Sequence, residues 1–202
     1  PGIDGIMPSK IDYSHLKILE RRVKTLPIGL QNHIYRVGDI AESLAGVHNL
    51  DPIKARLGML AHDIARSMPD QRLLQLARAF DLGVDPIEEQ LPVLLHGPVG
   101  AELLQREEGI EDTGLYEAVY WHTTGNAAMD SFAKLVFLAD KLDPQKCKRY
   151  PYQQRLMELA KVDLDHAMVE FLTRELITLA TGGFLIHPDM LATRNFLIQS
   201  NP

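Results

Sequence analysis

The stretch Leu57-Gly-Met-Leu-Ala-His-Asp-Ile-Ala65 decides the fold prediction. Leucine, alanine and isoleucine recur in it at positions i, i+3, i+4, i+7 and i+8, the spacing of one buried face of an α-helix. The same spacing recurs, in whole or in part, at 37–45, 115–122, 132–140 and 164–172. The alternation typical of β-strands is missing from the sequence, in which 184–186 is one short candidate for an extended piece. We therefore predict a single all-α domain, an irregular bundle of roughly eight to ten helices.

Proline and glycine mark where these helices are expected to begin and end. Asp51-Pro52 is typical of a helix start, and Met68-Pro69 is expected to end the helix that contains Leu57–Ala65. Turn-rich segments follow at 81–86, 109–114, 124–126, 143–144 and 181–183. Neither an internal repeat nor a linker divides the chain into two domains.

Composition and charge narrow the classes of protein. Of 202 residues, 46% are hydrophobic and 24% charged, the balance of a globular chain rather than a disordered one. No apolar run reaches the length of a membrane span, and a net charge of −6 argues against binding to polymeric nucleic acid. The single Cys147 excludes a disulfide framework within the chain and a cysteine-based zinc site. With no signal peptide visible, we expect a reducing, cytoplasmic location.

Polar residues interrupt the apolar faces where core residues belong. An ionised aspartate in such a face needs a partner, because an unpaired buried carboxylate costs several kcal/mol. A metal site would partner all of them together, and imidazole with carboxylate suits iron, manganese, zinc or cobalt. Taken singly, each residue is more often a core or capping group, so the joint pattern carries the hypothesis. The set comprises His33, His62, Asp63, His122 and Asp140, together with His96, which follows Leu94-Leu95 at an expected loop-to-helix junction.

The order of these residues resembles the HD superfamily of metal-dependent phosphohydrolases, whose pattern is H…HD…H…H…D on an all-helical core. Longer segments are similar to the YqeK-type family of bacterial symmetrical diadenosine tetraphosphate hydrolases. The resemblance predicts an HD-type domain over residues 27–202, preceded by a helical extension over residues 1–26 that packs on the core. The similar segments are His62-Asp-Ile-Ala-Arg66, Leu95-His-Gly-Pro-Val-Gly-Ala101, Trp121-His-Thr-Thr-Gly125, Lys134-Leu-Val-Phe-Leu-Ala-Asp-Lys141, Ile186-His-Pro-Asp189 and Thr193-Arg-Asn195.

The resemblance implies a metal centre and assigns metal-binding or substrate-binding roles to its residues. The first ion would be iron, with manganese, cobalt, zinc or magnesium as alternatives, and its ligands would be His33, His62, Asp63 and Asp140. Asp63 could bridge to a second ion, which His96 and His122 hold in binuclear HD enzymes. In the YqeK-type group these two histidines look instead like substrate contacts, so we assign them to the substrate, with a second ion as the alternative.

The expected chemistry is hydrolysis of a phosphoanhydride. A metal ion polarises a phosphate oxygen and lowers the pKa of its bound water towards 7, which makes that water the attacking nucleophile. We expect Asp63 to orient this water. Either His96 or His122 would stabilise the transition state or protonate the leaving phosphate, and the sequence leaves that choice open.

Substrate-binding candidates lie around this set. Arg66, one helical turn beyond His62, could grip a phosphate unless it forms a surface salt bridge instead. Thr123 offers a hydroxyl, or simply ends a helix. Lys146 stands where the family places a phosphate-binding arginine, and a lysine lacks the planar fork; Leu30 stands where a basic residue is common. The nucleobase pocket would comprise His187, Pro188, Asp189, Met190 and Leu191, although a helix cap at Pro188-Asp189 explains this segment nearly as well.

The leading interpretation is a metal-dependent hydrolase that cuts diadenosine tetraphosphate into two ADP. A related alternative is an HD phosphohydrolase that acts on a nucleoside mono- or triphosphate or an alarmone. An alternative of another class is a nucleotide-binding sensor without turnover, and a third is a purely structural helical scaffold. A homodimer is plausible, but no sequence feature requires it.

Overall fold

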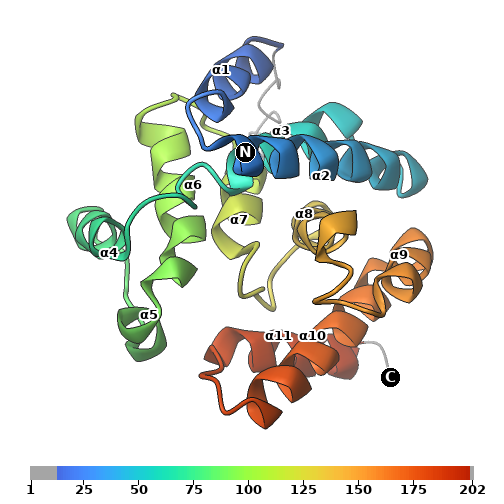
Figure 1. Ribbon diagram of the computed structural model, residues 1–202. Helices are drawn as coiled ribbons and strands as arrows, with labels where there is room; N and C mark the ends of the chain where they lie inside the picture. The colour runs from blue at the N-terminus through green and yellow to red at the C-terminus, as the bar shows by residue number, and fades with distance from the viewer. Residues whose placement is uncertain (1–12, 201–202) are drawn as a thin grey trace, which may run out of the picture.

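The computed structural model describes residues 13–200, and every regular element in this range is helical (Figure 1). This confirms the all-α prediction. The described residues contain eleven α-helices, one more than the upper limit of the predicted eight to ten. The short helix over Pro86–Gln90 was not expected, because a capping box of Asp85 and Glu88 starts it within the turn-rich segment 81–86. The elements are α1 (Tyr13–Val23), α2 (Ile28–Val47), α3 (Pro52–His62), α4 (Asp70–Ala79), α5 (Pro86–Gln90), the 3₁₀ helix η1 (Pro92–Leu95), α6 (His96–Arg106), α7 (Thr113–Trp121), α8 (Ser131–Lys141), the 3₁₀ helix η2 (Pro144–Lys146), α9 (Gln153–Val162), α10 (Leu164–Thr181) and α11 (Pro188–Ser200).

The main core lies between α2, α3, α7 and α8. The expected face of α2 is buried, with Val37 and Ala41 fully inaccessible to solvent. On α8 every residue from Leu135 to Lys141 is buried, because neighbouring helices cover it on several sides. Figure 1 shows α7 and α8 in the middle, α4 and α5 on the left, α9 on the right, and α10 and α11 at the bottom. The central position of α8 brings its polar residue Asp140 into the interior.

The helix predicted through Leu57–Ala65 ends earlier than expected. α3 stops at His62, and the residues up to Ser67 form turns closed by short bonds such as Arg66 N–H to the Asp63 carbonyl at 3.0 Å. Ile64 and Ala65 remain buried, but they belong to a second, smaller core with α4 and α6. The apolar spacing therefore predicted correctly which residues are buried, but it did not predict that the helix ends at His62. The residues before and after this point pack against different helices.

The N-terminal segment is described in part. Residues 1–12 of the predicted extension 1–26 lie outside the described range, and α1 packs on α3 with Leu19 and Val23 fully buried. The division between an extension and a domain over 27–202 stays a prediction. None of the helices between residues 13 and 200 is long and apolar enough to cross a membrane.

The C-terminal helices α10 and α11 pack together as a hairpin. Their connection contains Gly183 at φ +69°, a left-handed conformation that glycine adopts without strain. The expected extended piece at 184–186 has no strand pairing within residues 13–200. The hairpin instead places His187 and Met190 at the wall of the large cavity described below.

Candidate metal centre

Helix ends deliver most of the six predicted polar residues to one place. His62 is the last residue of α3, Asp63 follows it, His96 is the first residue of α6, and His122 follows α7. None of the six is more than 9% exposed, although they come from five parts of the chain. The complete set is His33, His62, Asp63, His96, His122 and Asp140.

Three of the histidines are oriented by the main chain. The ring Nδ1 of His62 lies 2.7 Å from the Met59 carbonyl, and that of His122 lies 2.7 Å from the Val119 carbonyl. His96 makes the same bond, to the carbonyl three residues before it. These carbonyls belong to the last turns of helices, where main-chain acceptors are available to side chains. Because a carbonyl oxygen only accepts, Nδ1 carries the hydrogen and Nε2 keeps a lone pair.

His33 is oriented by a side chain instead. It lies inside α2, and its Nδ1 donates to Asp143 Oδ2 at 2.6 Å. Asp143 is 2% exposed and also binds both the Nε and Nη2 groups of Arg36, at 3.0 and 2.8 Å. Burial alone would raise the pKa of the Asp143 carboxyl, but the Arg36 and His33 donors hold it at about 2. A carboxylate therefore fixes the His33 tautomer, and its Nε2 also presents a lone pair.

The free ring nitrogens meet two carboxylates. His33 Nε2 lies 3.0 Å from Asp140 Oδ1 and 3.7 Å from Asp63 Oδ2. His62 Nε2 lies 3.4 Å from Asp63 Oδ2 and 3.7 Å from Asp140 Oδ1, and it has no hydrogen-bond partner among the described residues. Two ligands about 2.1 Å from one ion are ~3.0 Å apart at a right angle and ~3.4 Å apart at the tetrahedral angle. The four side chains thus fit a first-row metal ion.

The other oxygen of Asp63 faces a second pair of ring nitrogens. His96 Nε2 lies 3.1 Å and His122 Nε2 3.6 Å from Asp63 Oδ1. These two nitrogens are 3.0 Å apart. Since each ring already donates through Nδ1, two facing lone pairs at this distance need a proton or a metal cation to hold them together. The geometry therefore suits Asp63 as a bridge between two positions.

Burial and the two carboxylates shift the pKa values of the histidines in opposite directions. Burial alone would lower the pKa of His62, but the carboxylates of Asp63 and Asp140 raise it to about 9. Burial would likewise raise the pKa of both carboxyls, yet the surrounding His and Lys groups hold them well below their usual range. Burial lowers the pKa of His122 to about 4, so its ring stays neutral, as a ligand must.

Comparison with known proteins fits this geometry. The sequence profile of the HD domain family matches residues 30–145. The chain belongs to the HD domain family. It is 28% identical over 84% of its length to the symmetrical bis(5'-nucleosyl)-tetraphosphatase of Bacillus subtilis, covering 89% of that protein. It is 33% identical over 82% of its length to the protein of the same name from Halalkalibacterium halodurans, covering 87% of it.

A solved structure shares the fold. A protein from Clostridium acetobutylicum, described as a predicted HD superfamily hydrolase involved in NAD metabolism, superposes with a TM-score of 0.87 at 27% identity, covering 94% of this chain and 99% of that one. The chain is therefore a member of an HD-domain hydrolase family, and its His/Asp cluster could hold a metal ion.

A cavity of about 730 Å³ borders the candidate metal centre, and His33, Asp63 and Asp140 form part of its wall. Its walls combine cations with apolar side chains, the surface that an anion with an organic body requires. The cations are Arg66, Lys141, Lys146 and Arg149, and the apolar lining includes Leu30, Leu91, Leu94, Leu179, Leu185 and Met190. Leu30, where the resemblance led us to expect a basic residue, contributes an apolar surface instead.

Of the predicted substrate contacts, Arg66, Thr123 and Lys146 line this cavity, whereas His96 and His122 do not. Arg66 lies in the turn after α3 rather than on a helix, and it forms no salt bridge with any residue from 13 to 200, contrary to the alternative reading. Thr123 has a buried hydroxyl without a hydrogen-bond partner in the same range. Lys146 is already engaged, because its Nζ lies 2.5 Å from Asp140 Oδ1.

Only part of the predicted nucleobase segment 187–191 reaches the cavity. His187 and Met190 line it. Pro188 and Asp189 occupy the first turn of α11, as the helix-cap alternative proposed, and Leu191 is 49% exposed. The reason is helical geometry: of five consecutive residues at a helix start, only those on one face can point to the same wall.

Three further residues have roles that the sequence reasoning did not assign. Lys141 is buried, and its Nζ donates to Asp140 Oδ2 at 2.6 Å and to the His122 carbonyl at 3.0 Å. Arg149 lines the cavity and pairs with Glu175 at 2.6 Å. Both lie in a basic stretch of the sequence, residues 141–149, which contains three lysines and one arginine, and this clustering is the signal that could have found them. Asp143 gave no signal of its own, because its role depends on a helix 110 residues away.

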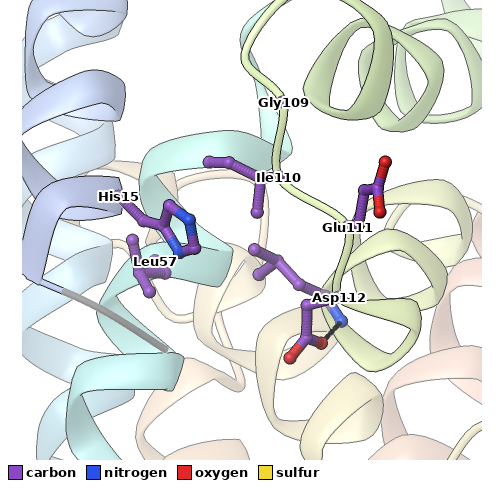
Figure 2. Close-up of a pocket in the computed structure, with 7 residues that line it drawn as sticks. His15, Leu57, Gly109, Ile110, Glu111 and Asp112 are labelled. Atoms are coloured by element: carbon purple, nitrogen blue, oxygen red, sulfur yellow. Dashed lines mark hydrogen bonds between the residues drawn. The ribbon is translucent and has the colours of Figure 1, made fainter. Parts of the chain in front are cut away.

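A second cavity, of about 280 Å³, lies away from the centre between α1, α3 and the segment before α7. Figure 2 shows His15 and Leu57 facing Ile110 and Asp112 across it. Asp112 caps α7 by accepting the Leu115 N–H at 2.7 Å. This cavity contains none of the six predicted centre residues, so we place the chemistry at the larger one.

Proposed function

We propose that this HD-domain protein hydrolyses diadenosine tetraphosphate symmetrically into two ADP. One observation carries the proposal: four imidazole Nε2 atoms and two carboxylates meet at one place, and three of these groups, from His33, Asp63 and Asp140, line a cavity together with cations and apolar side chains. The names of the relatives with 28–33% identity support the substrate.

The proposed first ion is iron, held by His33, His62, Asp63 and Asp140. Family resemblance supports this choice, while the donor set itself also suits manganese, cobalt or zinc. The spacing of His96 and His122 about the second oxygen of Asp63 favours a second ion over a substrate contact. When bound, such ions neutralise phosphate charge and lower the pKa of water.

The side chains around the centre would bind and orient the polyphosphate. Arg66 and Arg149 have planar guanidinium groups that can bind phosphate oxygens in pairs. Lys146 forms an ion pair with Asp140. When a metal cation binds that carboxylate, the Lys146 ammonium group would be released to form an ion pair with a phosphate instead. Thr123 supplies a hydroxyl that has no partner among the described residues. Together they hold the central anhydride bond beside Asp63, which orients the attacking water.

The apolar part of the cavity would receive the adenosine groups. His187 offers an imidazole face, and its Nδ1 already accepts the Asp189 N–H at 3.3 Å. Met190 and Leu185 form apolar walls beside it. A cytoplasmic location and a homodimer remain predictions from the sequence.

The decisive experiment follows the products of diadenosine tetraphosphate in water enriched in ¹⁸O. Cleavage of the central anhydride gives ADP alone, with one ¹⁸O atom for every two ADP formed. Activity should disappear on chelation and return with iron or manganese. ATP plus AMP would contradict symmetric cleavage. Absence of turnover with every metal, together with retained nucleotide binding, would favour the sensor.

A further inference from the structure

His33 differs from the other three histidines of the centre in how its ring is held. The other rings donate to carbonyls at helix ends, three residues earlier in the chain. Inside α2 the carbonyls of the preceding turn accept the N–H groups of the helix itself. The His33 ring therefore depends on an acceptor from elsewhere, and Asp143, at the start of η2, supplies it.

Asp143 is held in turn from the same helix. Arg36 lies one turn after His33 on α2 and binds Asp143 through two parallel N–H groups. Gln153 donates to the Asp143 main-chain carbonyl at 2.7 Å. The carboxylate is thus fixed on both oxygens and at its backbone, so it can fix the His33 ring.

We propose that Asp143, clamped by Arg36, is the positioning residue of the metal centre, setting the His33 tautomer and directing its Nε2 at Asp140 and Asp63. A carboxylate behind a metal-binding imidazole orients the ring and makes it a stronger ligand. The inference rests on the metal centre of the proposed function. It adds a residue pair that contacts neither the ion nor the substrate.

A purely structural role for Asp143 can be separated from this one. Asp143 caps η2 by accepting the Gln145 N–H at 3.0 Å, and asparagine caps helices equally well. Asp143→Asn therefore keeps the cap but removes the charge that binds His33 and Arg36 together. Asp143→Glu keeps the charge and should restore part of the effect.

The test is the affinity of metal-free protein for Co²⁺, measured by competition with a chelator and by the visible absorption of bound Co²⁺. Asp143→Asn should weaken binding of the first ion about 10- to 100-fold and shift the spectrum. Arg36→Gln should act in the same direction by a smaller factor. Matched controls are Asp112→Asn, another buried capping aspartate, and Arg56→Gln, whose arginine pairs with Asp39 and Glu42. Both controls should leave the affinity within about twofold of wild type, below ~0.4 kcal/mol.

A folded Asp143→Asn variant with wild-type affinity and spectrum would overturn the inference while leaving the metal centre intact. If Asp143→Asn does not fold, Arg36→Gln decides, because Arg36 is partly exposed: unchanged Co²⁺ affinity overturns the proposal, and weakened affinity supports it. If wild-type protein binds no Co²⁺, the metal centre and the inference fail together.

Discussion

The two halves of the centre are built differently. On the α6–α7 side, main-chain carbonyls hold His96 and His122, and no charged side chain is needed to orient them. On the α2–α8 side, charged side chains orient the residues of the centre: Asp143 binds His33, and Lys141 and Lys146 bind Asp140. A histidine at a helix end finds a main-chain carbonyl acceptor three residues earlier, whereas one inside a helix must obtain its acceptor from a distant residue.

Asp63 joins the halves, so its loss has the largest expected effect. Asp63→Asn removes the charge that faces both pairs of histidines, and turnover should fall on the order of 10³-fold or more. Metal content, measured by elemental analysis, should fall with it. Asp112→Asn serves as the control. More than a tenth of wild-type activity in Asp63→Asn would mean that the halves work independently.

Removing metal should affect stability next most strongly. An ion that binds only the folded protein, at 100 times its dissociation constant, stabilises by about 2.7 kcal/mol. For a chain of this size, chelation should therefore lower Tm by about 5–10 °C. Differential scanning calorimetry with and without chelator measures this change in Tm. The same measurement on His62→Ala, which should show no change on chelation, tests whether the ion that stabilises the protein binds at the centre. An equal shift in His62→Ala would place the ion elsewhere.

The α6–α7 half depends on close packing of the backbone, and two glycines test this. A Cβ on Gly97 would lie 2.7 Å from the Tyr120 carbonyl, whereas one on Gly100 would make ordinary contacts at 3.6 Å. Gly97→Ala should lower the free energy of unfolding by about 1–3 kcal/mol and reduce turnover, because it separates His96 from His122. Gly100→Ala should change both little. Urea unfolding measures the difference, and equal effects would contradict the packing argument.

Among these predictions, the smallest effect is expected from substitution of Lys146, which binds Asp140 in the α2–α8 half of the centre. Its ammonium competes with a cation for Asp140, so Lys146→Ala should leave Co²⁺ affinity undiminished. KM for the dinucleotide should rise about five- to tenfold, equivalent to ~1–1.4 kcal/mol. Lys148→Ala is the control, since the exposed Lys148 does not line the cavity. Weaker Co²⁺ binding by Lys146→Ala would instead make Lys146 part of the support of the centre.

The cavity walls show where sequence reasoning reached its limit. Arg66 and Thr123 were predicted beside the centre because they lie within four residues of its histidines in the chain. The segment 187–191 was predicted as a block, but only His187, directly before α11, and Met190, in its first turn, line the cavity. Adjacency in sequence predicts position well near an anchored residue and poorly where a helix begins.

The sequence by itself determined the helical class and the six polar residues of the centre, because apolar periodicity and its interruptions are local patterns. It could not determine that α3 ends at His62. Ile64 is buried in the second core, and the apolar pattern is the same as if it were buried on a continuing helix. Only the tertiary structure decided which oxygen of Asp63 faces which histidines, and that Asp143 and Arg36 stand behind His33. These contacts join segments up to 110 residues apart, and long-range packing alone brings them together.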